Sequence, residues 1–206
     1  HLSLRRQRQM CIRDRPTRGK TEALPTGKNF FSVDSRGLPT ESAWIVGRNS
    51  ASQILDLYKQ ENGEDLKNIA ISVWATSTMR NGGEDICQIL YLLGVQPIWD
   101  GPSRRVIDLE IIPLSILDRP RVDVTLRISG MFRDAFPQLV KLTSKAINLV
   151  SNLNEDDIFN PLAKALKEGD PINRIFGSAP GSYGAGLQEL ISNSNWENID
   201  DFGESF

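Results

Sequence analysis

Histidine is nearly absent from this sequence, since the only one is His1, at the first position. A Ser/His/Asp triad, a Cys/His pair and a histidine-ligated zinc ion are therefore excluded. Two cysteines, Cys11 and Cys87, are too few for a disulfide framework or a cysteine-rich metal site, which fits a reducing cytoplasm. No apolar run approaches the roughly 20 residues that cross a bilayer, so we expect a cytoplasmic protein with no membrane partner. Any chemistry must use carboxylates, arginines, hydroxyls and backbone amides.

Positive charge is confined to the N-terminus. The first 20 residues contain seven Lys or Arg and one acid, so they carry +6, while the remaining 186 carry −8. An acidic body does not offer the phosphate-neutralising surface that nucleic acid requires, so we expect no nucleic-acid partner. Residues 1–15 have no helical or strand periodicity and are interpreted as a foreign or disordered leader, with a native basic arm as the alternative. Residues 16–206 are expected to form one domain.

Hydrophobic periodicity predicts helices and strands in alternation along the chain. Helices are expected at residues 41–60, 85–93, 132–153, 161–167 and 187–192. Strands are expected at residues 68–74, 95–99, 106–112, 122–128 and 173–176. This order predicts an α/β fold: a doubly wound, mostly parallel sheet with helices on both faces.

Loops that follow the strands are the candidate ligand site, because ligands of such sheets bind beyond the carboxyl ends of the strands. These loops are residues 75–84, 100–105, 129–134 and 177–186. We expect all of them to open on the same side of the sheet and to line one cleft.

The last of these loops is rich in glycine and reads GSAPGSYGAG. Its backbone amides could converge on an anion, whereas a tight turn in which glycine supplies a positive φ is the alternative. No dinucleotide or Walker motif is present, since Gly19-Lys20-Thr21 has Asp14 where the first Walker glycine would stand. The loop supplies the candidate contacts Ser178, Gly181, Tyr183 and Gly184.

Charged residues gather in the other loops. Arg80 suits a carboxylate-bearing ligand, and Glu84 or Asp85 suits a metal ion or proton transfer. The alternative is that both acids only complement the dipole of the following helix. Arg127 ends a strand, and the adjacent Arg133 and Asp134 form either ligand contacts or an internal salt bridge. The tryptophans, Trp44, Trp74, Trp99 and Trp196, are interpreted as packing residues without a role.

Six motifs, in order, resemble the large, tetrapyrrole-binding subunit of the ATP-dependent cobalt and magnesium chelatases. They are LPTGKNFFSVD (24–34), SVWATSTMR (72–80), GVQPIWD (94–100), RPRVDVT (119–125), RISGMFRDAFP (127–137) and RIFGSAPGSYGAG (174–186). The resemblance covers residues 24–206, and the glycine-rich loop is more similar to the cobalt enzymes of corrin synthesis. It therefore favours cobalt, with magnesium as the alternative metal substrate.

The resemblance implies a tetrapyrrole substrate similar to hydrogenobyrinic acid diamide and separate AAA-type subunits that hydrolyse ATP. The family's large subunit is several times longer, so we expect a fragment of a cobaltochelatase of cobalamin biosynthesis that is inactive alone. Metal insertion needs an acceptor for pyrrole protons, and Glu84 and Asp85 are preferred over Asp100, Asp123 and Asp134. The substrate contacts are expected to be Arg80, Arg127, Arg133, Asp134, Ser178, Gly181, Tyr183 and Gly184.

Two other functions stay open. The chain could be a non-catalytic scaffold domain that shapes the cleft or docks the ATPase subunits. It could also be an independent enzyme acting on a phosphorylated ligand, which only the glycine-rich loop suggests. If the charged loops converge on one cavity, that would favour a substrate-binding part of the chelatase over a non-catalytic scaffold.

We predict that the purified chain does not hydrolyse ATP, because no glycine-rich segment carries the Lys and Ser/Thr that hold the β- and γ-phosphates and Mg²⁺. The measurement is phosphate release against a no-protein blank, after contaminating ATPases have been removed. Steady release that stays with the chain through purification would contradict the prediction.

Overall fold

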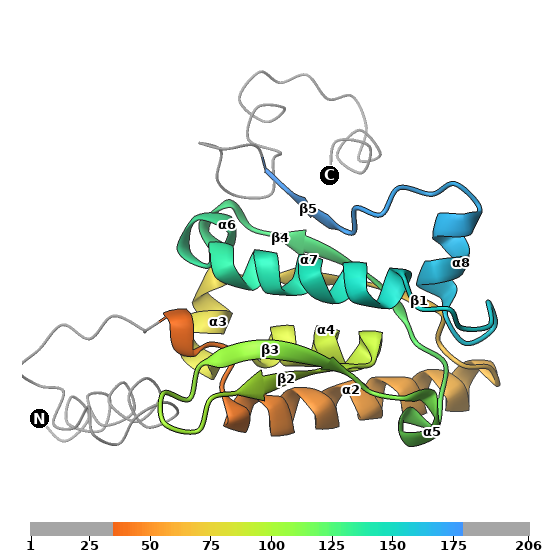
Figure 1. The fold of residues 1–206 in the computed structure, drawn as a ribbon, viewed down its shortest axis with the longest axis horizontal. Helices are drawn as coiled ribbons and strands as arrows, with labels where there is room; N and C mark the ends of the chain where they lie inside the picture. The colour runs from red at the N-terminus through yellow and green to blue at the C-terminus, as the bar shows by residue number, and fades with distance from the viewer. Residues whose placement is uncertain (1–34, 179–206) are drawn as a thin grey trace, which may run out of the picture.

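The computed structural model describes residues 35–178 of the chain (Figure 1). The helices are η3 (Ser35–Gly37), α2 (Glu41–Asn62), α3 (Ala75–Asn81), α4 (Glu84–Leu93), α5 (Leu114–Leu117), α6 (Gly130–Ala135), α7 (Pro137–Ser151) and α8 (Pro161–Lys167). The strands are β1 (Asn68–Val73), β2 (Val95–Trp99), β3 (Val106–Ile111), β4 (Asp123–Ile128) and β5 (Ile175–Gly177). The helix expected at 187–192 lies outside the described residues.

Three of the strands form a parallel sheet in the order β1-β4-β5. Val73 pairs with Ile128, and Ile128 pairs with Gly177, so the three strands end in one row. Strands β2 and β3 form a separate antiparallel hairpin beside α4 and α7. The expected α/β class with a mostly parallel sheet is confirmed, whereas the expected helices on both faces of that sheet are not seen within residues 35–178.

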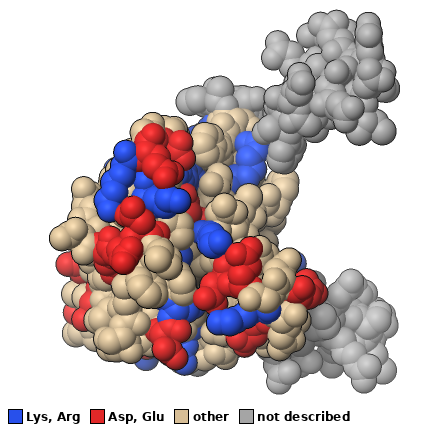
Figure 2. Space-filling model, turned by 90° about the vertical axis from the view of Figure 1, so that its right-hand side faces the viewer, with Lys and Arg blue, Asp and Glu red and all other residues tan. Residues whose placement is uncertain are grey.

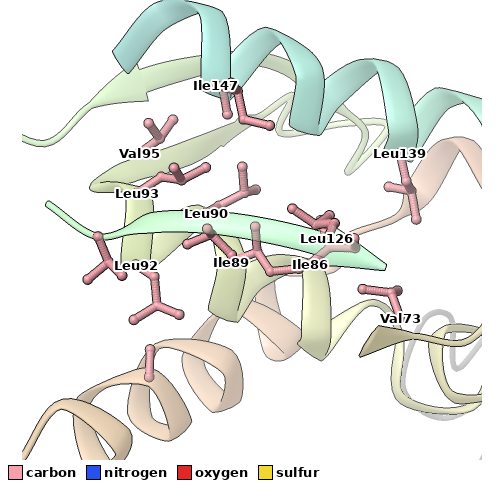
Figure 3. Packing of buried hydrophobic residues seen from close by; sticks show 14 of the residues in the cluster. Val73, Ile86, Ile89, Leu90, Leu92, Leu93, Val95, Leu126, Leu139 and Ile147 are labelled. Atoms are coloured by element: carbon pink, nitrogen blue, oxygen red, sulfur yellow. The ribbon is translucent and has the colours of Figure 1, made fainter. Parts of the chain in front are cut away.

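The core lies between the parallel sheet and the helices α4 and α7. Figure 3 shows Leu126 of β4 close to Ile86 and Ile89 of α4, with Leu139 of α7 beside them. Within residues 35–178, α4 and α7 flank the same face of the sheet, and α2 packs on the outer side of α4. The strand order β1-β4-β5 advances in one direction, so two crossovers of the usual right hand are expected to place their helices on the same face.

The helix expected at 132–153 is two helices, α6 and α7, divided at Phe136. Phe136 has a non-helical backbone (φ −131°, ψ 50°) because the ring of Pro137 disfavours the helical conformation of the preceding residue. The first helix begins earlier than expected, at Gly130, where the Ser129 hydroxyl accepts a hydrogen bond from the Phe132 amide (3.1 Å).

Residues 75–81, expected as a loop, form helix α3. Its Thr-, Ser- and Asn-rich sequence has weak helix propensity, and Trp74 provides no side-chain cap. Tertiary packing stabilises the helix instead, since Ala75 and Thr78 are buried and the Thr78 hydroxyl donates to the Trp74 carbonyl (3.0 Å). The prediction of a loop was wrong because these contacts come from the rest of the fold.

Residues 100–105 are the turn of the β2–β3 hairpin and do not follow a strand of the parallel sheet. The Asp100 carboxylate accepts a hydrogen bond from the Ser103 amide (3.1 Å), and the Asp100 amide donates to the Arg105 carbonyl (2.8 Å). Only three of the four expected loops, those that follow β1, β4 and β5, therefore begin at the same edge of the parallel sheet.

Arg121, just before β4, is completely buried and pairs with Glu155 in the connection after α7. Its Nη1 atom also donates to the Leu93 and Gly94 carbonyls (3.2 and 2.9 Å), at the end of α4. Gly94 has φ +79°, and a Cβ there would stand 2.2 Å from Arg121 Nη1, so this position requires glycine. The pair joins α4 to the start of β4.

The end of the molecule where α2 finishes and α8 lies carries charges of both signs close together (Figure 2). Exposed ion pairs account for this mixture, such as Lys59–Asp65 (2.8 Å) and Lys167–Asp157 (2.6 Å). This surface is a solvated face with mixed charges rather than a patch of only positive or only negative charge. In the part of the chain that the structure describes, no helix is both long and apolar enough to cross a membrane.

Glu155→Ala should lower the free energy of unfolding by about 3 kcal/mol, because it leaves the buried Arg121 guanidinium without its counter-charge. Urea denaturation followed by circular dichroism measures this change. Asp65→Ala is the control, since it removes an exposed ion pair and should cost less than about 1 kcal/mol. Equal losses in the two variants would contradict the prediction.

Candidate functional site

The candidate site is the edge of the sheet where β1, β4 and β5 end. The Ser129 amide donates to the Val73 carbonyl (3.2 Å), which holds the start of α6 against the end of β1. A Cβ on Gly177 would lie 2.8 Å from Ile128 Cγ1, so glycine allows the last residue of β5 to approach β4 closely. The segments after the three strands therefore begin side by side.

Arg133 of α6 connects that helix to the start of the glycine-rich loop. Its guanidinium binds the Asp134 carboxylate through two hydrogen bonds (2.7 and 3.0 Å), and its Nη1 atom donates to the Ser178 carbonyl. The expected alternative of an internal salt bridge is thus present in the structure. Most of the Arg133 guanidinium is occupied by these hydrogen bonds. Together they can hold Ser178 at the edge of the candidate site.

Two other arginines, expected as substrate contacts, lie on different elements. Arg127 is half-buried on β4, in register with Ser72 of β1 and Phe176 of β5. Arg80 is exposed in the last turn of α3 and makes no ion pair within residues 35–178. An exposed guanidinium at this position can bind a carboxylate in bidentate fashion.

Glu84 and Asp85 form the first turn of α4, after a turn made by Asn81, Gly82 and Gly83. The Asn81 side-chain oxygen accepts hydrogen bonds from the amides of Gly83 (3.0 Å) and Glu84 (3.3 Å), and so caps the helix. Burial raises the pKa of Asp85 above its ordinary value, against a smaller opposing effect of its hydrogen bond with Asn81. Asp85 is therefore a carboxylate with an increased affinity for a proton.

The other carboxylates that were considered as proton acceptors have structural partners. Asp100 caps the hairpin turn, and Asp134 is bound to Arg133. Asp123, at the amino end of β4, pairs with Arg174 (2.9 Å), with both side chains largely buried. Glu84 and Asp85 also make interactions in the structure, so the preference for these two acids stays a prediction.

Among the described residues, no group of three or more His, Cys, Asp or Glu side chains is arranged to hold a metal ion. The buried Cys87 does not supply a thiolate, because burial raises the pKa of its thiol far above the ordinary range. A metal ion that visits this site would meet carboxylates rather than a prepared ligand set.

Three expected contacts, Gly181, Tyr183 and Gly184, lie outside the described residues. Trp74, which the sequence analysis interpreted as a packing residue without a role, directly follows β1 at this edge and is 52% exposed. Period-two alternation could have identified it, since Val73 faces the core and the next side chain in an extended strand points away.

The fold and the aligned loops define an α/β protein with a candidate ligand edge at the carboxyl ends of its parallel strands. The chain belongs to the CobN/magnesium chelatase family, whose model matches residues 11–206. The resemblance inferred from the six motifs is thereby confirmed.

Individual relatives agree with this assignment. The chain is 48% identical to the aerobic cobaltochelatase subunit CobN of Pseudomonas aeruginosa, over 93% of this chain and 17% of the relative. It is 31% identical to the chloroplastic magnesium-chelatase subunit ChlH of Oryza sativa subsp. japonica, over 85% and 13% respectively.

A solved structure also matches. The catalytic subunit of cobaltochelatase from Mycobacterium tuberculosis superposes with a TM-score of 0.79 at 46% identity, covering 91% of this chain and 17% of that chain. This chain therefore spans 17% or less of the length of each of these three relatives. The higher identity to cobaltochelatases than to the magnesium-chelatase subunit confirms the expected order of similarity.

Asp85→Asn should leave the free energy of unfolding unchanged at pH 4 and raise it at pH 7. Because burial raises the folded-state pKa of Asp85, the folded protein holds this proton more tightly than the unfolded chain. The stability contributed by this group is therefore lost as the pH rises from the ordinary aspartate pKa through the raised value. Urea titrations of parent and variant at both pH values test this, and a variant that is less stable than the parent at pH 7 would contradict it.

Proposed function

We propose that this chain is part of the large subunit of an ATP-dependent cobaltochelatase and lines the cleft that binds the tetrapyrrole during cobalamin biosynthesis. The observation that carries the proposal is the register of Val73, Ile128 and Gly177, which starts three polar segments at one sheet edge. Family membership and the greater identity to cobaltochelatases support cobalt as the metal substrate, with magnesium as the alternative.

Substrate binding in this proposal relies on cations and backbone donors. A corrin precursor similar to hydrogenobyrinic acid diamide carries carboxylate and amide side chains, which Arg80 and Arg127 suit as donors. Arg133 and Asp134 hold Ser178, so that the glycine-rich loop begins at the cleft. Gly181, Tyr183 and Gly184 of that loop, outside the described residues, are proposed as further contacts.

Metal insertion in this proposal uses the carboxylates at the start of α4. A divalent ion that enters the macrocycle displaces protons from ring nitrogens, so a base must accept them. Glu84 and Asp85 are proposed for this role or for guiding the ion, and the raised pKa of Asp85 supports proton acceptance. Both acids lie in the first turn of α4, where the helix dipole stabilises negative charge. Complementing that dipole is therefore the competing explanation for their presence.

The remaining parts of the proposal concern partners and context. AAA-type subunits would hydrolyse ATP and drive the large subunit, and the chain alone would be inactive. We propose a cytoplasmic location, without a nucleic-acid or membrane partner. The interpretation of residues 1–15 as a leader and of residues 16–206 as one domain stays a prediction.

A scaffold role is the second candidate function, and a specific observation favours it. Arg133 donates hydrogen bonds to both the Asp134 carboxylate and the Ser178 carbonyl, which is the pattern expected of residues that shape a cleft. In this reading the chain positions the edge of the cleft, and the reacting groups come from other parts of the large subunit.

The test compares Arg80→Ala and Glu84→Gln in the intact large subunit. Arg80→Ala should weaken binding of hydrogenobyrinic acid diamide by roughly 1–3 kcal/mol, the scale of a lost charged hydrogen bond. Glu84→Gln should leave this affinity unchanged and slow cobalt insertion, because it removes charge and keeps shape. Fluorescence-quenching titrations give the affinity, and absorbance in the presence of Co²⁺, ATP and the ATPase subunits gives the rate.

Matched controls lie on α8 and at its C-cap, at the opposite end of the molecule (Figure 1). Lys164→Ala and Glu168→Gln remove an exposed cation and an exposed acid of the same surface pair, and both should behave as the parent. Parental binding by Arg80→Ala together with parental insertion by Glu84→Gln would overturn the catalytic proposal and leave the scaffold role.

A further inference from the structure

One face of the parallel sheet has no covering layer within residues 35–178. Along β1, Asn68, Ala70 and Ser72 are exposed while the alternate residues face the core. Their partners on β4, Asp123, Thr125 and Arg127, are only partly buried. Parallel sheets are normally covered on both faces, so we expect a further component to cover this one.

Two large aromatic side chains stand on this open face near the carboxyl edge. Trp74 continues β1 in an extended conformation (φ −115°, ψ 136°), so it points to the same side as Ser72 and away from the buried Val73. Phe176 of β5 is 47% exposed and pairs with Arg127, which in turn pairs with Ser72. The open face therefore carries an aromatic residue at each margin and an arginine between them.

The size of this arrangement suits a flat ring system. Neighbouring strands lie about 4.8 Å apart, so β1 and β5 are separated by roughly 10 Å across β4. Apart from Arg127, this part of the face carries the small side chains of Ala70, Ser72 and Thr125, so the two aromatic residues and the arginine are its large side chains. A planar macrocycle of about 10 Å could contact both margins at once.

The exposure of Trp74 also differs from that of the other described tryptophans. The Trp44 ring packs against Tyr91 and Trp99, with centroids 6.0 and 6.4 Å apart, and Trp99 Nε1 donates to the Pro39 carbonyl (2.8 Å). Trp74 has no such ring contact or indole hydrogen bond within residues 35–178. A half-exposed indole at a ligand edge offers a large apolar surface at little conformational cost.

We propose that Trp74 stacks on the face of the tetrapyrrole and, with Phe176, forms an aromatic platform for the macrocycle, while Arg127 and Arg80 bind its carboxylates. This inference rests on the proposed function, since it names the residue that recognises the flat ring of the same substrate. The platform selects a planar conjugated ligand by its shape, whereas the arginines select the charge of its side chains. The competing occupant of this face is another segment of the large subunit.

The experiment uses the intact large subunit and hydrogenobyrinic acid diamide as the probe. Trp74→Ala should weaken binding about tenfold, and Trp74→Phe should retain affinity within about threefold because a smaller aromatic ring still stacks. The Trp74→Ala defect should persist at 1 M NaCl, whereas the Arg80→Ala defect should shrink there, because salt screens charges and leaves apolar contacts intact. Ile116→Ala, which shortens an exposed apolar side chain on α5, is the matched control and should bind as the parent.

Melting temperature separates this proposal from the competing occupant. A stacking residue should leave the melting temperature of the ligand-free subunit unchanged in Trp74→Ala. A lower melting temperature without ligand, restored by Trp74→Phe, with unchanged affinity for the probe, would show that a protein segment covers this face and would overturn the platform. Parental binding by Trp74→Ala, while Arg80→Ala still weakens binding, would refute the platform and leave the proposed function standing. No binding of the probe by the parent subunit would refute both.

Discussion

The guanidinium of Arg121 is completely buried, and every one of its five N–H donors has an acceptor in the surrounding structure. Glu155 receives two of these hydrogen bonds, at 2.7 and 2.8 Å, and the carbonyls of Leu93, Gly94 and Ile112 receive the others. A buried cation is costly unless it is paired and fully hydrogen-bonded, so this arrangement tolerates little displacement. It fixes the end of α4, the exit of β3 and the connection after α7 around the residue that leads into β4.

The position of β4 then determines where the candidate site forms. Because β4 is the central strand, its register with β1 and β5 decides which loops meet at the carboxyl edge. The three-residue strand β5 is too short to be secured by its ladder alone, and an arginine anchors the chain at each of its ends. Arg174 binds Asp123 at the amino end of β4, and Arg133 holds the Ser178 carbonyl beyond the last residue of β5. The glycine-rich loop thus starts from a point fixed on both sides.

Elements with strong local patterns were predictable from the sequence. The helix starting at Glu41 has its Thr40 cap and ends at a left-handed Gly63, and all the expected strands up to β4 lie within one residue of their predicted bounds. Helix α3 was not predictable, because Thr- and Ser-rich residues become helical there only through the burial of Ala75 and Thr78. The division at Phe136 was readable from Pro137, whose restriction on the preceding residue outweighs the continuous apolar period. The pairing of β2 with β3 also escaped prediction, since periodicity carries no information about strand partners.

The candidate site shows the same division between local and tertiary information. The polar character of the loops was evident in the sequence, but whether a given arginine or acid is engaged depends on partners far along the chain. Arg133 contacts Ser178, 45 residues away, and Asp123 contacts Arg174, 51 residues away. Such contacts engage several candidate residues with partners in the protein, whereas Arg80 is exposed and Glu84 and Asp85 lie at a helix start.

The turn between α3 and α4 explains why the proposed binding and proton-accepting roles belong to residues only four apart. Arg80 precedes the turn, Glu84 follows it, and Gly82 and Gly83 between them both have left-handed backbones (φ +77° and +91°). A Cβ on Gly82 would meet Thr40 Oγ1 at 2.9 Å, and one on Gly83 would meet Pro39 at 3.1 Å, so residues before α2 press directly on the turn. With the Thr40 amide donating to the Gly82 carbonyl (3.1 Å), the turn has one packed conformation. Backbone packing therefore fixes the positions from which the Arg80 and Glu84 side chains extend, which is the rigidity that the proposed site requires.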